Sequence, residues 1–461
     1  MEGRLRQLQE RAEPSVALHH PYSSGGRATS GPASPPVPRG GLRVEDLPSD
    51  VRRKLLRSFI PHSTNFGFFL DGARFQSSHE GDQPSPALSS AINLMGAYFS
   101  PQQELSSLQH DVLTQALQDA SRGLSVNHPH RVLHTIQAEV LIAQYLFLNG
   151  RVLEGKYHIG TAVSLVLGAG FHKIRSGHQQ AIPRSGMSPP MPRDAREEVE
   201  RVNALWTVLV LNDCWAAADG GPSNIAYDVP ESRVDSPWPL DFGGREPHFP
   251  GNLQSGHTIQ NFLANQPDGV TSLNALHAKA AILFEQASRL LRQYEPNLNA
   301  REAAKFQVTF GNLNTLIHRF VSELPALSGV SSKATLRRLL VIHTLARVAA
   351  IQLHYIFAAQ NANSHAIIVS NAETIVTLLR ETNMSDFPFV DPIMGVLWTA
   401  TAKVFADEIT VVRARTSQSQ RPPSKDIVAA VEMIMSVMSF FAPHSPLLDS
   451  QLAQVRRSIV G

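Results

Sequence analysis

The stretch that decides the fold is residues 130–168, HRVLHTIQAEVLIAQYLFLNGRVLEGKYHIGTAVSLVLG. Apolar side chains recur every three or four positions in its first half, which predicts a helix over residues 131–148. The residues expected on one face are Val132, Ile136, Val140, Ala143 and Phe147. Asn149-Gly150 can adopt the positive φ that ends a helix, so the chain is expected to turn there.

A second helix should follow and run to about Leu167. Its apolar positions are Tyr157, Ala162, Leu165 and Val166. Gly155, Gly160 and Gly168 lower its helix propensity. Because a glycine tolerated inside a helix usually marks a close approach, we expect tight packing at these three positions. The pair of helices is similar to one tetratricopeptide-like hairpin, and since it is not repeated at a fixed period, a solenoid is not expected.

Residues 195–218 form the next predicted helix, which Gly220-Gly221-Pro222 should end. Trp206 and Trp215 are nine positions apart, about 180° around an α-helix, so the helix is expected to be buried on two opposite sides. Asp213 would then be buried as well, and a buried carboxylate is costly without a partner. The favoured interpretation of Asp213 is a structural ion pair, and the second is a role in sensing a ligand.

The rest of the chain is also predicted to be helical. Segments with helical spacing of apolar residues precede the hairpin at 44–59, 87–99 and 101–121. Those that follow it are 273–294, 300–324, 333–359, 365–382, 392–412, 425–441 and 446–457. Strand-like alternation is not sustained anywhere, so the predicted fold class is all-α, with long loop insertions at residues 175–193 and 240–271.

Composition limits the class of protein. Of the 461 residues, 43% are hydrophobic and 17% charged, and the net charge of +2 does not favour polyanion binding by the fold as a whole. The single cysteine, Cys214, excludes an intrachain disulfide and a cysteine cage for a metal, and a buried, inert thiol is expected. The apolar run 339–359 contains Arg347, which is costly in lipid, so a buried helix is expected and no membrane partner.

Signatures of catalysis are missing from the sequence. It contains no glycine-rich phosphate loop followed by lysine, no Gly-x-Ser-x-Gly and no His-Glu-x-x-His. His128, His130 and His134 have a spacing that suits a metal, but no further ligand accompanies them in a recognisable pattern. Ordinary hydrogen-bonding histidines at a helix start are the favoured interpretation. No catalytic, cofactor-binding or metal-binding residue is therefore expected.

Several short motifs follow one another in a distinctive order. They are Pro61-His62-Ser63, Phe66-Gly67-Phe68-Phe69-Leu70, His130-Arg131-Val132, Gln144-Tyr145, Asn149-Gly150-Arg151, Gly170-Phe171-His172, Glu200-Arg201, Trp206, Asp213, Gly221-Pro222 and Pro230. This order resembles the regulatory domain of fungal zinc-cluster transcription factors, best over residues 61–239 and only loosely over 273–461. Two positions depart from the family pattern: Val202-Asn203 replace a frequent pair of arginines, and Gly220-Gly221-Pro222 replaces a frequent Gly-Arg-Pro.

The resemblance implies that residues 44–461 form an all-α regulatory domain of a nuclear transcription factor for genes of RNA polymerase II. In that family, a separate head with six cysteines and two zinc ions binds DNA, and a linker and a short coiled coil follow it. Residues 1–11 resemble the end of such a coiled coil, and residues 1–43 as a whole are expected to be a disordered linker.

The resemblance also implies the partners of the chain. Zinc and DNA contacts would need an upstream cysteine-rich segment, because this chain has one cysteine. The partners expected for the chain itself are the transcription machinery or co-regulators and, as an option, a second copy in a homodimer.

Two groups of residues are candidate sites. If the domain holds a ligand cavity, it is expected near His172, Trp206, Asp213 and Trp215. A basic cluster is interpreted as the solvated face of a helix or, alternatively, as a nuclear import signal or phosphate contact. The cluster consists of Arg52, Arg53, Lys54 and Arg57.

Two other functions fit the same sequence: a helical co-regulator or scaffold that does not bind DNA, and an all-α enzyme. A cysteine-rich segment upstream in the reading frame would favour the transcription factor over the co-regulator. A deep pocket with several titratable groups of strongly perturbed pKa would favour the enzyme.

Overall fold

The computed structural model describes residues 47–72, 83–177, 189–227, 229–242, 248–416 and 425–460. All of them belong to one compact unit, Leu42–Gly461. The linker and coiled-coil remnant expected at residues 1–43 lie outside the described residues, and so do residues 178–188 of the first expected loop.

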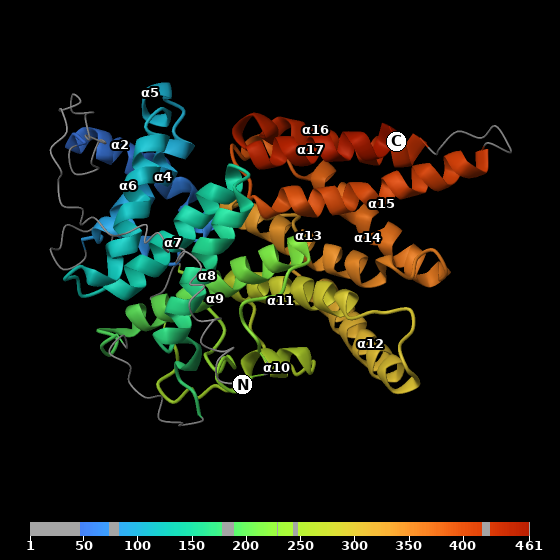
Figure 1. Cartoon of the computed structure of the whole chain (residues 1–461), viewed down its shortest axis with the longest axis horizontal. Coiled ribbons are helices and arrows are strands. Elements are labelled where there is room, and N and C mark those ends of the chain that lie inside the picture. Colours follow the sequence, from blue (N-terminus) through green and yellow to red (C-terminus); the bar gives the residue numbers. More distant parts are fainter. Residues whose placement is uncertain are drawn as a thin grey trace, which may run out of the picture. The chain divides into compact units, whose positions relative to one another are not determined.

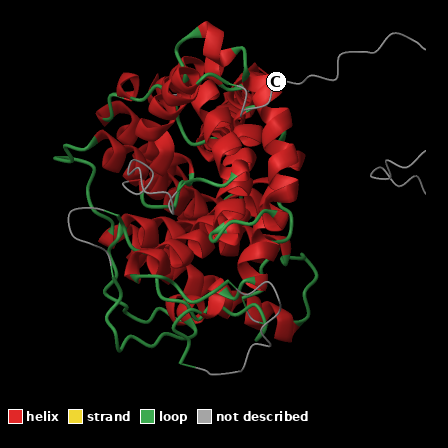
Figure 2. Cartoon of the chain, turned by 90° about the vertical axis from the view of Figure 1, so that its left-hand side faces the viewer, coloured by secondary structure: helices red, strands yellow, loops and turns green. Residues whose placement is uncertain are grey.

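Helices joined by loops make up the described part of the chain, which confirms the all-α fold class (Figure 2). The first elements are α2 (Ser49–Phe59), η2 (Ile60–Phe66), α4 (Pro86–Phe99), α5 (Gln103–Ser106), α6 (Gln109–Arg122), η4 (Gly123–Ser125), α7 (Arg131–Leu148), α8 (Val152–Gly168), η5 (Phe171–Lys173) and α9 (Ala195–Asp219). The later elements are α10 (Thr258–Leu263), α11 (Leu273–Arg292), α12 (Ala300–Glu323), α13 (Lys333–Tyr355), α14 (Ala362–Glu381), η6 (Met384–Asp386), α15 (Ile393–Thr416), α16 (Lys425–Phe441), η7 (Ala442–His444) and α17 (Pro446–Val460).

Side-chain caps explain where several helices begin. Ser85 accepts a hydrogen bond from Leu88 N ahead of α4, and Asp194 accepts one from Glu197 N ahead of α9. Asn299 and Glu302 form a reciprocal capping box at the start of α12. Each cap satisfies a backbone N–H that the helix itself leaves without a partner.

The hairpin of α7 and α8 is formed as predicted, and Gly150 ends α7 with a φ of 73°. A Cβ at Gly155 would overlap the ring of Phe147, which confirms the close approach expected there. At Gly160 the expectation is wrong, because a Cβ there would meet nothing within 4 Å. The likeness of the hairpin to a tetratricopeptide unit stays a prediction.

Burial of α7 is not restricted to one face. Helices α4, α6, α8 and α9 pack around it, and every residue from Leu133 to Leu148 is buried. Its polar side chains therefore need internal partners. Glu139, for example, lies 2.6 Å from His158 Nδ1 on α8.

Helix α9 is buried on two opposite sides, as the spacing of its tryptophans predicted. Trp206 stacks on Trp238, with ring centroids 4.5 Å apart. Trp215 stacks on Phe147 of α7, with centroids 3.9 Å apart. These two stacks hold α9 between the α7–α8 hairpin on one side and the loop that follows α9 on the other.

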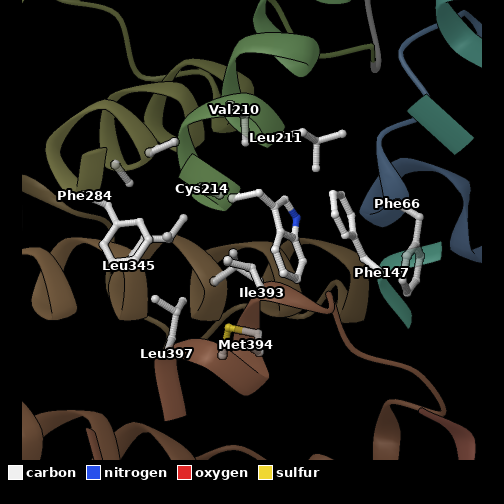
Figure 3. Packing of buried hydrophobic residues seen from close by; sticks show 14 of the residues in the cluster. Phe66, Phe147, Val210, Leu211, Cys214, Phe284, Leu345, Ile393, Met394 and Leu397 are labelled. Carbon is white, nitrogen blue, oxygen red and sulfur yellow. The ribbon is translucent and has the colours of Figure 1, made fainter. Parts of the chain in front are cut away.

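The core forms where helices from both halves of the sequence meet. In Figure 3, Phe147 of α7, Cys214 of α9, Phe284 of α11, Leu345 of α13 and Met394 of α15 converge on one apolar region. Cys214 is buried, as expected, and burial raises the pKa of its thiol well above the ordinary value. The thiol is therefore shielded from solvent and protonated at neutral pH.

The stretch 240–271, expected as a loop throughout, contains the short helix α10, so that expectation is wrong in part. Ile259 and Phe262 of α10 are buried. A helix of six residues is too short for helical periodicity to reveal it.

The C-terminal helices α15, α16 and α17 pack against one another at the red end of the chain (Figure 1). The apolar run 339–359 falls largely on α13, which is mostly buried, as expected. In the part of the chain that the structure describes, the one helix long and apolar enough to cross a membrane is Lys425–His444. This helix, α16 extended by η7, packs on α14, α15 and α17.

Candidate ligand cavity

A cavity of about 440 Å³ lies where seven segments of the chain meet. Residues 64–69, helices α7, α9, α11 and α13, residues 239–242 and Asp391 all contribute to its walls. Its volume falls in the range of pockets that hold small organic molecules.

Gln137 of α7 fixes the segment that forms one wall. Its Nε2 donates to Gly67 O at 3.0 Å, and its Oε1 accepts from Phe69 N at 2.7 Å. Gly67 has a φ of 79°, and a Cβ there would lie 2.9 Å from Val140 Cγ1. Only glycine adopts this conformation without strain, so Gly67 lets the segment cross close to α7.

Asn203 of α9 fixes the loop on another wall. Its Nδ2 donates to Leu240 O at 2.9 Å, and its Oδ1 accepts from Leu240 N at 3.1 Å. Asp241 accepts from Leu273 N and Asn274 N at 2.7 and 3.0 Å, so its carboxylate caps the start of α11. The polar groups of this wall are therefore occupied by contacts within the protein.

Other polar atoms of the lining are buried without a hydrogen-bond partner in the described residues. They are Nε and Nη1 of Arg337, Oε1 of Gln144 and Nδ2 of Asn65. Such atoms are rare in folded proteins, because an unmade hydrogen bond in the interior is costly.

Arg337 of α13 is a buried cation of the lining, with an exposed fraction of 6%. Its guanidinium lies over the ring of Phe387, 5.0 Å from the centroid. Burial lowers the pKa of Arg337 from its usual value. Because a guanidinium stays protonated in proteins, the wall of the cavity includes a positively charged side chain with two nitrogens that make no hydrogen bond within the described residues.

Arg338 adds a second cation to the lining, and burial lowers its pKa too, while the charges of Asp241 and Asp391 act against this. Neither carboxylate comes within ion-pair distance of Arg338 among the contacts of the described residues. Burial raises the pKa of Asp391 to about 6, and burial followed by the charge of Arg338 lowers the pKa of His277 to about 3.

Of the four residues expected near a cavity, Trp206 lines this one. Its indole Nε1 donates to Pro237 O at 2.7 Å, so the ring presents an apolar surface. Trp215 does not line it, and its ring is stacked on Phe147 instead.

His172 lies on η5 and is not part of the lining of the cavity. Its Nε2 is 3.0 Å from Glu231 O, and its own backbone oxygen accepts from Asp235 N at 2.9 Å. Burial and then the charge of Lys173 lower the pKa of His172 to about 4. The imidazole is therefore neutral and ties η5 to the loop after α9.

Asp213 is buried in a network of neutral donors. It accepts from Tyr227 Oη, from Asn212 Nδ2 at 3.1 Å and from Ser223 Oγ at 3.2 Å. The expected ion pair is wrong, because no cation of the described residues lies within ion-pair distance of this carboxylate. Burial, and then the charge of Glu285, raise the pKa of Asp213 well above its ordinary value, so the neutral acid fits the site.

Asp235 has the opposite surroundings, although it is fully buried as well. It accepts from Lys173 Nζ and Ser176 Oγ at 3.0 Å, and from Arg233 Nε and His257 N at 2.9 Å. Burial alone would raise the pKa of Asp235, but these donors hold it well below its usual value. This carboxylate anchors the loop after α9 on η5.

The three histidines around the start of α7 gather as a group. His134 Nδ1 accepts from Ser85 N at 3.2 Å, and His128 Nδ1 accepts from His130 N at 3.1 Å. These are ordinary hydrogen bonds of the kind expected. Among the described residues, no set of three or more His, Cys, Asp or Glu is arranged to hold a metal ion.

The basic cluster on α2 lies on the surface. Its four side chains are exposed, namely Arg52, Arg53, Lys54 and Arg57. Their placement is compatible with a solvated helix face and leaves all four accessible to a partner.

Sequence reasoning missed Arg337, Arg338 and Gln144 as residues of the cavity. One signal was present, because Arg337-Arg338 is a pair of adjacent cations that directly precedes the apolar run Leu339–Ile342. Two adjacent positions of a helix point about 100° apart, so such a helix cannot direct both arginines to solvent when its neighbours enclose it.

Comparison with known families identifies the larger part of the chain. Residues 52–315, more than half of the sequence, match the fungal specific transcription factor domain. No curated protein shows significant similarity to the chain. The cavity is formed partly by this matched region and partly by α13 and Asp391 beyond it. The match shows that the chain belongs to the family of proteins that carry the fungal specific transcription factor domain.

Proposed function

We propose that this chain is the regulatory part of a fungal transcription regulator of the zinc-cluster type, which acts in the nucleus on genes of RNA polymerase II. The observation that carries this proposal is the family match over residues 52–315. Residues 44–461 act as one regulatory domain, and co-regulators or the transcription machinery are its partners. Since the chain has one cysteine, DNA is bound through a zinc cluster that these residues do not supply.

A reporter assay tests this function. The full chain is fused to a heterologous sequence-specific DNA-binding domain and expressed in fungal cells with a matching reporter gene. We expect reporter transcription to differ from that produced by the DNA-binding domain alone. A fusion with Asp235→Asn, which is expected to weaken the fold, should show a smaller difference. A fusion that occupies the reporter promoter and leaves transcription unchanged would contradict the proposal.

We further propose that the basic cluster on α2 directs nuclear import. All four cations are exposed there, so an import receptor could reach them. Replacing Arg52, Arg53, Lys54 and Arg57 by glutamine in a fluorescently tagged full chain should reduce nuclear accumulation. The matched control replaces Arg301 and Lys305, which are exposed on α12, by glutamine and should leave localisation unchanged. Equal localisation of all three proteins would remove the import role.

A further inference from the structure

We propose that the cavity between α9, α11 and α13 binds a small organic monoanion, a carboxylate attached to an apolar ring or chain, and that Arg337 holds the carboxylate. The binding rests on the geometry of the cavity alone. Its regulatory consequence rests on the proposed function.

The unused donors of Arg337 call for an acceptor. Nε and Nη1 are buried without a hydrogen-bond partner in the described part of the chain, at a residue exposed by only 6%. A carboxylate oxygen would supply a charge-assisted hydrogen bond, the strongest kind available to a guanidinium. It would also offset the cost of a buried positive charge.

The charges of the lining favour one negative charge on the ligand over two. The lining contains Arg337 and Arg338 together with Asp241 and Asp391, so it has two groups of each sign. Both carboxylates are engaged at helix starts, Asp241 by α11 and Asp391 by Ile393 N of α15 at 3.0 Å. A dianion such as phosphate would leave a large excess of negative charge in a poorly solvated space.

The remaining wall fits an apolar body. Phe68, Trp206 and Phe242 line it with aromatic surface, and Val210, Leu211 and Val341 add aliphatic surface. The indole Nε1 of Trp206 is already used by Pro237 O, so the ring offers no donor to the ligand. Gln144 Oε1 and Asn65 Nδ2 lack partners within the described residues and could bind a second polar group, such as a hydroxyl.

The place of the cavity gives the ligand a structural effect. One part of the lining belongs to the matched region 52–315, and another part belongs to α13 and Asp391. A ligand that contacts both parts stabilises the arrangement in which they are docked, by an amount set by its affinity.

Calorimetric titration of the purified full chain tests the proposal. The probes are 2-naphthoate, 3-phenylpropionate and decanoate, with 2-naphthamide as an uncharged analogue and inorganic phosphate as an anion without an apolar body. We expect at least one carboxylate to bind with a Kd of about 1 mM or tighter. The amide should bind about tenfold more weakly than naphthoate, and phosphate should bind more weakly than the best carboxylate.

Variants identify the residue that holds the carboxylate. Arg337→Met should weaken binding about 10- to 100-fold, the effect of one lost charge-assisted hydrogen bond. Arg301→Met, at an exposed position of α12, is the matched control and should bind like the wild type. If Arg337→Met fails to fold, Val341→Phe takes its place, because it fills the cavity while every charge is kept.

Four results would each overturn the proposal. They are no binding of any carboxylate at about 10 mM, equal binding of the amide, equal binding of phosphate, and full affinity in Arg337→Met or, if that variant does not fold, in Val341→Phe. The reporter assay separates this site from the proposed function. If a carboxylate binds but the chain has no effect on transcription, the binding site is supported and the proposed function is contradicted. If the chain affects transcription but no carboxylate binds, the function is supported and the binding site is contradicted.

Discussion

Asp235 and Arg337 are two buried charged side chains with opposite surroundings. Asp235 accepts hydrogen bonds from Lys173, Arg233, a hydroxyl and a backbone N–H, so its charge is offset within the protein. Arg337 is also buried, yet two of its nitrogens have no partner in the described residues. Burial removes both side chains from water, and the difference lies in what replaces the water: protein donors surround Asp235, whereas for Arg337 we propose a bound carboxylate.

The largest effect on stability is expected from a substitution of Asp235, the side chain whose charge is offset within the protein. Asp235→Asn removes the charge between Lys173 and Arg233 and leaves both cations without their anion. We expect the free energy of unfolding to fall by about 3 kcal/mol, as when one partner of a buried ion pair is removed. Chemical denaturation followed by circular dichroism measures the change.

Asp219→Asn is the matched control for that variant. Asp219 pairs with Lys156 at the surface, where 44% of the Asp219 side chain is exposed. Its loss should cost less than about 1 kcal/mol, because solvent screens exposed pairs. Equal costs for Asp219→Asn and Asp235→Asn would show that the burial of Asp235 adds nothing.

Asp213 sharpens the comparison through pH, since its pKa is raised whereas that of Asp235 is lowered. A raised folded pKa means that the folded state binds the proton more tightly, so this contribution to stability is full in acid and is lost as the pH rises above about 3.9, the unfolded value. Asp235 has the opposite sign: its contribution is present above that value and is lost as the pH falls below it.

Asp213→Asn should therefore flatten the loss of stability that accompanies rising pH. Between about pH 4 and pH 7, the difference in free energy of unfolding between variant and wild type should shift by about 1 kcal/mol or more in favour of the variant. Denaturation curves recorded across this pH range give the pH dependence of the free energy of unfolding for the variant and for the wild type. Identical slopes would mean that Asp213 is charged in the folded protein.

The smallest effect on stability is expected from Arg337→Met. The variant loses the contact with Phe387, worth about 1 kcal/mol, but it also removes a buried charge with unused donors. The two changes should nearly cancel, so the free energy of unfolding in the absence of ligand should stay within about 1 kcal/mol of the wild type. A loss as large as that of Asp235→Asn would make Arg337 a structural anchor and end the contrast between the two sites.

The helices were predictable because their signals are local. The spacing of apolar residues placed a helix at 131–148, and the structure has α7 at Arg131–Leu148. The segment 425–441 likewise matches α16. By contrast, α10 is a helix of only six residues, which is too short for a local pattern of apolar residues to indicate it.

The cavity was predictable only in part, since seven segments form it and periodicity says nothing of how segments meet. Trp206 was one of the four residues expected near a ligand cavity, and it lines this one. Arg337 was not expected there, because the sequence does not show whether a buried cation of a helix will pair with a carboxylate or line a cavity. The ion pair expected for Asp213 failed for the same reason: the sequence shows that a partner is needed and not that it will be Tyr227.

The chain has one thiol, and it lies in the apolar region where α9, α11, α13 and α15 meet (Figure 3). A thiol reagent added to the native protein thus has one possible target, and it can reach that target only while these helices are apart. The rate at which a thiol reagent modifies Cys214 would therefore report how often the core opens, with no background from other cysteines. Any molecule that holds these helices together would slow the modification of Cys214, whatever the chemistry of that molecule.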